Sequence, residues 1–195
     1  MTAAAPVEDV VRIAFRGPLA AFMRDETRMV DLEGALSSGK TTACLVKEYL
    51  AAEQHPGLWS LICRFADGDT STKLIPAWER VCQQFGEMPT WNAREEYYGF
   101  RNGSRVYAFG LFQPKAASRY AKLRGFGGSR IYIDQAEEMP QDFLGELVLR
   151  LRQQGYQHQL TFSPNPMGEN DWLTEEFPED DGRPNRKYYS ISIFD

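Results

Sequence analysis

The chain has 195 residues, of which 43% are hydrophobic and 13% aromatic, and this composition is typical of one globular domain with a sizeable core. Its 22 basic and 27 acidic residues give a formal net charge of -5, which argues against a free-standing duplex-DNA binder held by phosphate contacts. No apolar run approaches the roughly 20 residues that span a bilayer, and the first residues lack the basic flank of a signal peptide. We therefore expect a single soluble, intracellular domain over residues 1–195, with no membrane partner.

The cysteines Cys44, Cys63 and Cys82 are widely spaced, and the chain has only two histidines. This pattern excludes a zinc cluster and does not favour a disulfide framework. We expect these side chains to be small buried hydrophobes in a reducing compartment.

The spacing of apolar residues predicts strands that alternate with helices. Strands are predicted at 28–33, 58–66, 130–134, 157–163 and 187–194, and helices at 41–53, 72–85 and 141–154. Residues 1–27 are expected to form a helical lead-in, Asn102-Gly103 a hairpin turn within 100–112, and 178–186 a polar, mobile loop. Such alternation predicts an α/β fold with a mostly parallel central sheet flanked by helices and joined by right-handed crossovers.

The stretch GALSSGKT fits the phosphate-loop pattern G-x-x-x-x-G-K-[ST] and lies between the first predicted strand and the helix that follows it. There, backbone N–H groups at the start of the helix wrap a pyrophosphate, and the helix dipole also favours anions. Lys40, which we expect on an exposed loop, would reach the β- and γ-phosphates, and Thr41 would be a ligand of Mg²⁺. The predicted nucleotide-binding residues are Gly34, Ala35, Leu36, Ser37, Ser38, Gly39, Lys40, Thr41 and Thr42.

A second motif, Ile131-Tyr-Ile-Asp134, is an apolar strand that ends in a carboxylate. In phosphate-loop enzymes such an aspartate holds Mg²⁺ beside the γ-phosphate. A chance glycine-rich turn would leave this second motif unexplained. Together the two motifs predict a P-loop NTPase of the ASCE or RecA-like type, with ATP and Mg²⁺ as ligands.

Further motifs accompany these two along the chain. They are the Asn102-Gly103-Ser104 turn, the LRG segment 123–125, the RLR segment 150–152 and TFSPNP at 161–166. In this order the motifs resemble the N-terminal ATPase domain of the large terminase subunit of tailed bacteriophages. The resemblance implies an ATPase that drives viral double-stranded DNA into a procapsid. It also implies a ring of subunits, contacts with the portal protein and the small terminase subunit, and a location in the host cytoplasm. The family's nuclease domain and its activity are not expected within these residues.

The resemblance also suggests roles for Ser163 and Phe22. Ser163 would begin a coupling motif that senses the γ-phosphate, although a strand-terminating turn set by the prolines that follow explains it equally well. Phe22 is a candidate for stacking on adenine. The spacing of Phe15, Leu19 and Phe22 fits a helical core stripe better.

Three arginines, Arg124, Arg150 and Arg152, are candidates for a finger that stabilises charge on a neighbouring subunit's nucleotide. Arg150 and Arg152 are expected two residues apart on one helix, where they would not share a face. Many family members carry an arginine inside the phosphate loop, and Leu36 takes that place in this sequence. The finger must therefore come from elsewhere.

The catalytic base is the point where the sequence departs from the family. Motors of this class usually place a glutamate directly after the metal-binding aspartate, but here that residue is Gln135. An amide positions water but is a poor proton acceptor. Either Gln135 orients the water much as a GTPase glutamine does, or a nearby glutamate, Glu137 or Glu138, folds back as the base. A further alternative is that both glutamates are solvated residues near a helix N-terminus. We favour Glu137 over Glu138, with Gln135 as a water-positioning partner.

The alternative is a non-motor P-loop NTPase, such as a nucleotide switch or a small-molecule kinase. A kinase needs a lid with several basic residues, and no arginine-rich insert follows Asp134. Turnover that rises with DNA or with a portal protein would distinguish the motor from both.

Overall fold

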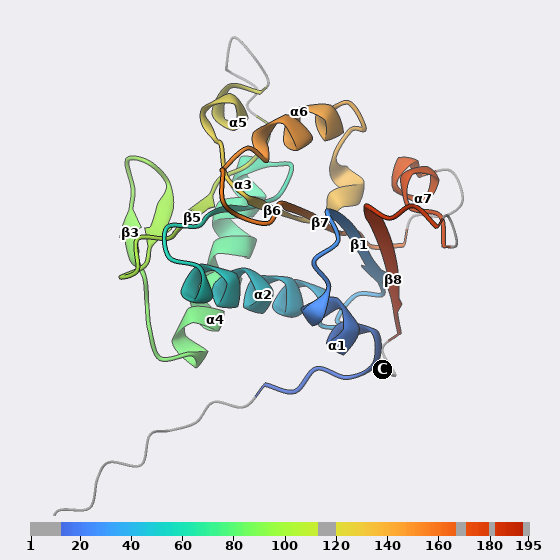
Figure 1. Cartoon of the computed structure of the whole chain (residues 1–195), viewed down its shortest axis with the longest axis horizontal. Helices are drawn as coiled ribbons and strands as arrows, with labels where there is room; N and C mark the ends of the chain where they lie inside the picture. Colours follow the sequence, from blue (N-terminus) through green and yellow to red (C-terminus); the bar gives the residue numbers. More distant parts are fainter. Residues whose placement is uncertain (1–12, 113–119, 167–170, 180–181, 193–195) are drawn as a thin grey trace, which may run out of the picture.

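The structure is a computed structural model that describes residues 13–112, 120–166, 171–179 and 182–192. A central sheet runs through the molecule with helices on both of its faces (Figure 1). No helix in these ranges is both long and apolar enough to cross a membrane.

The sheet has eight strands in the order β3-β4-β5-β2-β6-β7-β1-β8. Every neighbouring pair from β5 to β8 is parallel, whereas β3, β4 and β5 pair antiparallel, so the predicted mostly parallel sheet is confirmed. The strands are β1 Met29–Gly34, β2 Trp59–Cys63, β3 Thr90–Asn92, β4 Tyr97–Gly99, β5 Arg105–Ala108, β6 Arg130–Asp134, β7 Gln159–Ser163 and β8 Arg186–Ile191.

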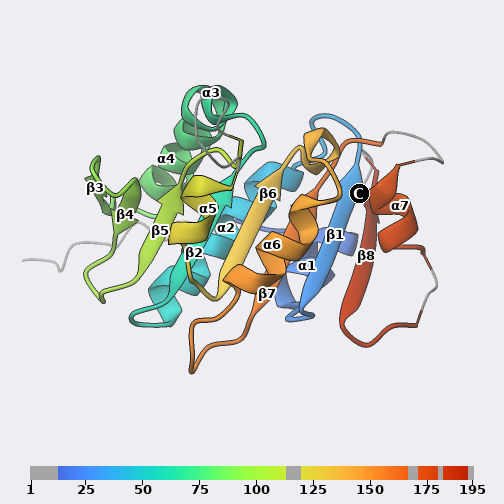
Figure 2. The same ribbon diagram turned by 90° about the horizontal axis from the view of Figure 1, so that it is seen from above.

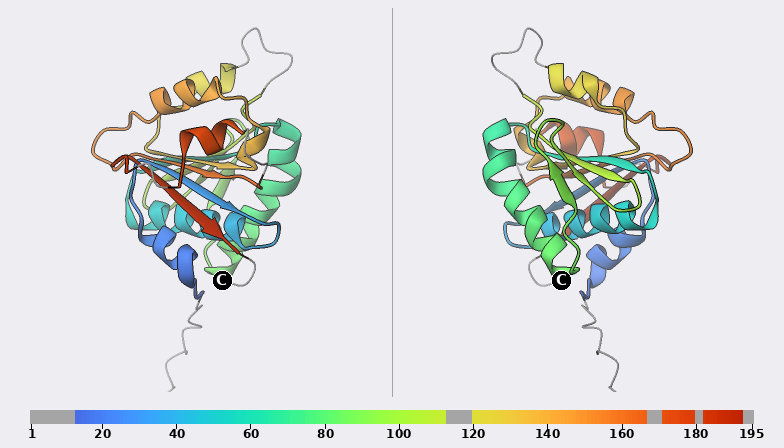
Figure 3. Two further views of the ribbon diagram at one scale, coloured as in Figure 1. Left: turned by 90° about the vertical axis from the view of Figure 1, so that its right-hand side faces the viewer. Right: turned by 90° about the vertical axis from the view of Figure 1, so that its left-hand side faces the viewer.

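The helices form a layer on each face of the sheet (Figures 2 and 3). Helices α1, α2 and α4 cover one face, and α5 and α6 cover the other, with α7 packed on the second face beside β8. The helices are α1 Gly17–Arg24, α2 Lys40–Gln54, α3 Asp67–Asp69, α4 Ile75–Gln84, α5 Ala121–Gly125, α6 Phe143–Arg150 and α7 Trp172–Glu176; a π-helical turn covers Thr70–Leu74 and a 3-10 turn covers Ala136–Glu138.

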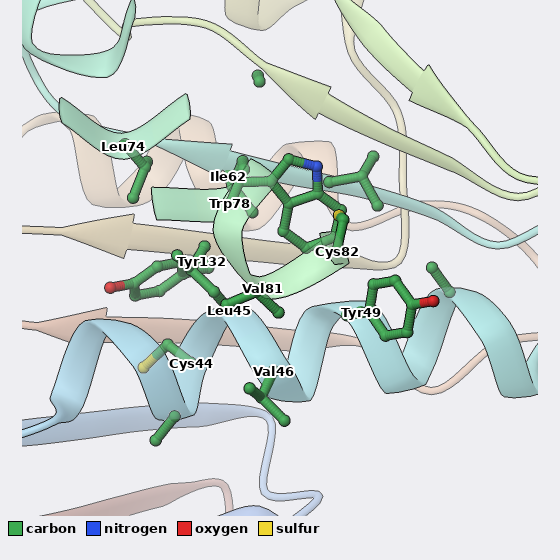
Figure 4. Close-up of a cluster of buried hydrophobic side chains, with 14 of the residues drawn as sticks. Cys44, Leu45, Val46, Tyr49, Ile62, Leu74, Trp78, Val81, Cys82 and Tyr132 are labelled. Atoms are coloured by element: carbon green, nitrogen blue, oxygen red, sulfur yellow. The ribbon is translucent and has the colours of Figure 1, made fainter. Parts of the chain in front are cut away.

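The buried hydrophobic side chains form two clusters, one on each face of the sheet, because successive residues of a strand point to opposite faces. Ile62 and Tyr132 point into the cluster under α2 and α4, whereas their neighbours Leu61 and Ile131 point into the cluster under α5 and α6. Figure 4 shows side chains of α2 and α4 meeting over the sheet in the first cluster. Because both faces are buried, the central strands need continuous apolar runs, which is why they were predictable.

The order of the strands brings the two nucleotide motifs together. Strand β7 pairs with β1 on one side and with β6 on the other, and its last residue Ser163 lies opposite Asp134. The phosphate loop follows β1 directly. The carboxyl ends of these three parallel strands therefore place the loop, Asp134 and Ser163 at one edge of the sheet.

Most predicted elements are confirmed within a few residues, including the turn at Asn102-Gly103 between β4 and β5. All three cysteines are free and buried, as expected. Residues 17–24 of the predicted helical lead-in form α1, whereas residues 1–12 lie outside the described ranges, as do 180 and 181 of the predicted loop. The three-residue strand β3 is exposed at the edge of the sheet and was not predicted, because it has no buried face to give a pattern.

The predicted helix 141–154 is too long, since α6 ends at Arg150. Leu151 forms an isolated parallel bridge with Gly128, and the N–H of Arg152 donates to the carbonyl of Gly128 at 2.9 Å. Pairing with the segment before β6 thus replaces the next helical turn. Arg150 and Arg152 are therefore not on one helix, contrary to the prediction.

The predicted helix 72–85 begins earlier, at Asp67, and passes through the π-helical turn before α4. Pro76 lies in the first turn of α4 and has no N–H to donate. A widened turn before a proline accommodates this missing donor.

Candidate active site

The phosphate loop connects β1 to α2 and contains two positions that require glycine, one for lack of space and one for its backbone conformation. An added Cβ at Gly34 would lie 2.6 Å from the carbonyl oxygen of Ile191 on β8, so no larger residue fits. Gly39 has a φ of 86°, in the left-handed region. Helix α2 then begins without a side-chain cap among the described residues, which leaves the N–H groups of its first turn available to an anion.

A cavity of about 290 Å³ lies over this loop and the carboxyl ends of β6 and β7. This volume is close to the lower end of the roughly 300–1,000 Å³ range of small-molecule sites. The lining residues are Leu36, Ser37, Ser38, Gly39, Lys40, Thr41, Thr42, Arg64, Asp134, Gln135, Ser163 and Asn165. The structure thus brings together most of the residues predicted for nucleotide binding.

Lys40 is the first residue of α2 and is only 7% exposed, so the expectation of an exposed loop lysine is wrong. Its ammonium group donates to the carbonyl oxygens of Gly34 and Ala35, the latter at 3.0 Å, and to Oδ1 of Asn165 at 3.5 Å. Burial lowers the pKa of Lys40, while the carboxylates of Glu137 and Asp134 oppose this shift. Its present partners are backbone and amide oxygens, which a phosphate oxygen could replace.

Asp134 is almost fully buried and is the centre of a polar cluster. Its Oδ1 accepts hydrogen bonds from Thr41 Oγ1 at 2.8 Å, Tyr132 Oη at 2.8 Å and Ser163 Oγ at 3.3 Å. Its Oδ2 accepts from Nε and Nη2 of Arg64, at 2.7 and 2.6 Å. The two predicted metal ligands, Thr41 and Asp134, therefore lie in direct contact.

The chemistry of this cluster fits a magnesium ion. The described residues contain no group of three or more His, Cys, Asp or Glu side chains that could hold a metal ion by themselves. Mg²⁺ usually takes only one or two protein oxygens and completes its shell with water and phosphate. One hydroxyl and one carboxylate beside a phosphate loop match that preference. The hydroxyl of Ser38 is also buried without a partner in the described structure, which leaves it free for a phosphate oxygen.

The residues after β6 divide between the cavity and its surroundings. Gln135 lines the cavity and has a φ of 53°, which turns the chain sharply after the strand. Glu137 is not among the lining residues, but it contacts one of them, Asn165. Its carboxylate accepts hydrogen bonds from the backbone N–H of Asn165 at 3.1 Å and from Nδ2 of Asn165 at 2.7 Å. Glu138 is exposed. Of the two glutamates, Glu137 is thus the one connected to the cavity, through Asn165.

Phe22 does not line the cavity. Its side chain is fully buried, edge-on to Tyr189, and the ammonium group of Lys47 lies 4.3 Å from its ring centroid. Phe15 and Leu19 pack against the same cluster. The core-stripe interpretation therefore holds, and the candidate role of Phe22 in stacking on adenine is wrong because no face of its ring is open to a base.

The three arginines proposed as fingers also lie outside the cavity lining. Arg124 and Arg152 are exposed, while Arg150 forms an ion pair with Glu146 at 3.2 Å and donates to the carbonyl of Arg124. The arginine that does line the cavity is Arg64, which sequence reasoning missed. Arg64 falls inside the predicted strand 58–66, and its place at the same edge of the sheet as Asp134 depends on the parallel pairing of β2 with β6, which no local pattern records.

A comparison with protein families adds the decisive observation. The profile described as phage terminase large subunit matches residues 78–193, which is more than half of the chain. This chain belongs to that family. The sequence-based resemblance to terminases is therefore confirmed. No curated protein matches the terminase chain significantly.

Solved terminase structures share the fold. The large terminase of a thermophilic bacteriophage superposes with a TM-score of 0.78 at 17% identity, covering 94% of this chain and 47% of the phage protein. The complex of that same phage terminase with ADP gives a TM-score of 0.76 at 16% identity, with 93% and 46% covered. The large terminase ATPase domain of Thermus phage P74-26 gives 0.67 at 16% identity, with 92% and 81% covered. This chain thus spans about half the length of the first of these terminases, and the shared fold is that of the P-loop NTPase type.

Proposed function

We propose that this terminase chain hydrolyses ATP to ADP and phosphate, and that hydrolysis powers the movement of viral double-stranded DNA into a procapsid. The observation that carries the proposal is the direct contact between Thr41 and Asp134 in a cavity above the phosphate loop. Two separately recognised motifs meet there in the arrangement that P-loop chemistry requires. The ADP complex of the thermophilic phage terminase, which has the same fold, supports a nucleotide as the ligand.

Phosphate binding is the task of the loop and of the start of α2. The N–H groups of residues 35–41 surround the phosphates, and Lys40 moves from the carbonyls of Gly34 and Ala35 to the β- and γ-phosphate oxygens. Thr41 and Asp134 are the residues that would hold Mg²⁺. When bound, this ion neutralises negative charge on the β- and γ-phosphate oxygens.

Water attack is assigned to the residues after β6. Gln135 lines the cavity and orients a water molecule toward the γ-phosphorus. The new bond joins the water oxygen to that phosphorus, the bond to the β–γ bridging oxygen breaks, and ADP is the leaving group. Glu137 takes the water proton after its carboxylate is released by Asn165. Ser163 lies against Asp134 at the end of β7, where it reports the state of the phosphate to the segment that follows.

A further positive charge is assigned to a neighbouring subunit. Leu36 is 72% exposed at the loop position where many terminases carry an arginine, and Arg124 is exposed on α5. We assign the finger in trans to Arg124, with a ring of subunits docked transiently on the procapsid portal in the host cytoplasm. Double-stranded DNA and the small terminase subunit complete the proposed set of partners.

The proposal is tested by following phosphate release from ATP with Mg²⁺ or with a chelator, each with and without linear double-stranded DNA. The expected result is transfer of the γ-phosphate to water, a requirement for Mg²⁺ and a higher rate with DNA. Transfer of the phosphate to a small-molecule acceptor would indicate a kinase instead. Nucleotide binding with hydrolysis that responds neither to DNA nor to a portal protein would indicate a switch.

A further inference from the structure

Arg64 has a hydrogen-bonding capacity that the described structure leaves unused. Its side chain is 11% exposed and lines the cavity at the carboxyl end of β2. Nε and Nη2 both bind Oδ2 of Asp134, but Nη1 is buried and has no hydrogen-bond partner in the described part of the chain. A buried N–H group without an acceptor is unfavourable, so this donor is suited to a ligand that supplies one.

The cavity around Arg64 has few other positively charged side chains that could bind a phosphate. Among its lining residues only Lys40 and Arg64 are positively charged. Leu36, at the tip of the phosphate loop, supplies no charge and points to solvent. A guanidinium group has five donors in a planar fork that matches phosphate oxygens, whereas an ammonium group acts as a point charge. Among the lining residues, Arg64 is therefore the one whose planar fork can donate two hydrogen bonds to the oxygens of one phosphate.

The contact between Arg64 and Asp134 explains how a bound metal ion would release the arginine side chain. Asp134 now divides its two oxygens between Thr41 on one side and Arg64 on the other. A divalent cation held by Thr41 and Asp134 would neutralise the same carboxylate and repel the guanidinium beside it. Because Arg64 lines the cavity, its released side chain would remain next to a phosphate bound there.

We propose that Arg64 binds the terminal phosphate of ATP within its own subunit, exchanging Asp134 for that phosphate when nucleotide and metal enter. Arg64 thereby supplies from β2 the guanidinium that Leu36 does not supply from the phosphate loop. This inference rests on the proposed function, because it requires ATP in the cavity. It differs from an arginine finger in trans, since it acts in a monomer.

The test compares the affinities of ATPγS and ADP, each with Mg²⁺, for the wild-type chain and for Arg64→Gln at low protein concentration. Arg64→Gln should weaken ATPγS binding by about 10- to 100-fold, the range expected for a charge-assisted hydrogen bond. ADP binding should change by less than about threefold. Arg64→Lys should give an intermediate loss for ATPγS, because it keeps the charge without the fork. Arg101→Gln, at an exposed ion pair with Glu87, is the matched control.

The possible outcomes distinguish a failure of this inference from a failure of the proposed function. Equal loss of ATPγS and ADP binding would mean that Arg64 only neutralises Asp134, and would overturn the inference while leaving the nucleotide site intact. Unchanged affinities for both ligands would overturn it as well. Failure of the wild-type chain to bind either nucleotide would overturn the proposed function and the inference together. Circular dichroism of each variant confirms that a lost affinity reflects the site rather than the fold.

Discussion

The two ends of β6 each carry a buried charged cluster, and the clusters differ in how completely their atoms are paired. At the amino end, Arg130 binds Glu48 of α2 at 2.8 Å through Nη2, with Nε 3.1 Å from each carboxylate oxygen. The same Nη2 donates to Oε1 of Gln159 at 2.7 Å, and Gln159 in turn donates to the carbonyls of Asp25 and Thr27. This cluster ties α2, β6, β7 and the segment before β1 into one arrangement.

At the carboxyl end, Asp134 is as deeply buried as Glu48, but its neighbourhood is incomplete. Nη1 of Arg64 and the hydroxyl of Ser38 have no partner in the described structure, and a cavity lies beside them. Burial of charge alone thus does not identify a site, because the paired cluster at the amino end is equally buried. The unused donors and the open space beside them distinguish the end that is suited to bind a ligand.

The largest expected effect concerns the positive charge that a neighbouring subunit would supply to the site at the carboxyl end of β6. If Arg124 acts in trans, the isolated chain should hydrolyse ATP slowly as a monomer and faster per subunit when crowded, since arginine fingers increase rates by roughly 10³- to 10⁵-fold. Hydrolysis is measured across a range of protein concentrations. Arg124→Ala should remove the rise with concentration and leave the slow basal rate, whereas Arg152→Ala should keep both the rise and the basal rate. High activity that is independent of concentration would argue against a finger in trans.

The next largest effect is expected at the amino end of β6, where a substitution should change the stability of the fold but not the affinity for nucleotide. Glu48→Ala leaves Arg130 buried without its carboxylate, which should lower the free energy of unfolding by about 3–5 kcal/mol. Denaturant unfolding measures the loss, with the exposed Glu53→Ala on the same helix as a control expected to change stability by less than about 0.5 kcal/mol. Nucleotide affinity of folded Glu48→Ala should match that of the wild-type chain. A selective loss of ATP binding would show that the two clusters are coupled.

A smaller effect, on the rate of hydrolysis alone, is expected for Glu137, the proposed base at the carboxyl end of β6. Glu137→Ala should reduce steady-state hydrolysis by about 100-fold while ATP binding is retained, because general-base removal slows only the proton transfer. Glu138→Ala is the control, since this neighbouring glutamate is exposed. If Gln135→Ala alone loses turnover, the amide is the catalytic group and the assignment to Glu137 is wrong.

The sequence predicted those parts of the fold in which burial leaves a pattern. Strand β6 has the predicted bounds because all five of its residues are buried between two helical layers. The end of α6 was missed because Leu151 continues the apolar spacing of the helix, while its backbone is captured by Gly128. No local pattern records such a pairing between segments far apart in the chain.

The candidate site was predictable to the extent that its residues lie in contiguous motifs. The phosphate loop and Asp134 were found because spacing and strand context identify them. Arg64 and the partner of Glu137, Asn165, were missed because their roles depend on which strands are neighbours in the sheet. For Phe22, the helical spacing with Phe15 and Leu19 favoured the core position that the structure confirms, whereas its distance from the loop, which suggested stacking on adenine, carried no information about burial.

Lys40 is the residue whose removal most sharply tests whether the cavity above the phosphate loop binds and hydrolyses ATP. ATP hydrolysis and thermal unfolding are measured for the wild-type chain, Lys40→Ala and the control Lys73→Ala, whose exposed lysine pairs with Asp69. Lys40→Ala should lose hydrolysis by at least the roughly 10²- to 10³-fold typical of removing one preorganised donor, with cooperative unfolding retained. Lys73→Ala should hydrolyse ATP at the wild-type rate. Hydrolysis by folded Lys40→Ala at the wild-type rate would contradict the assignment.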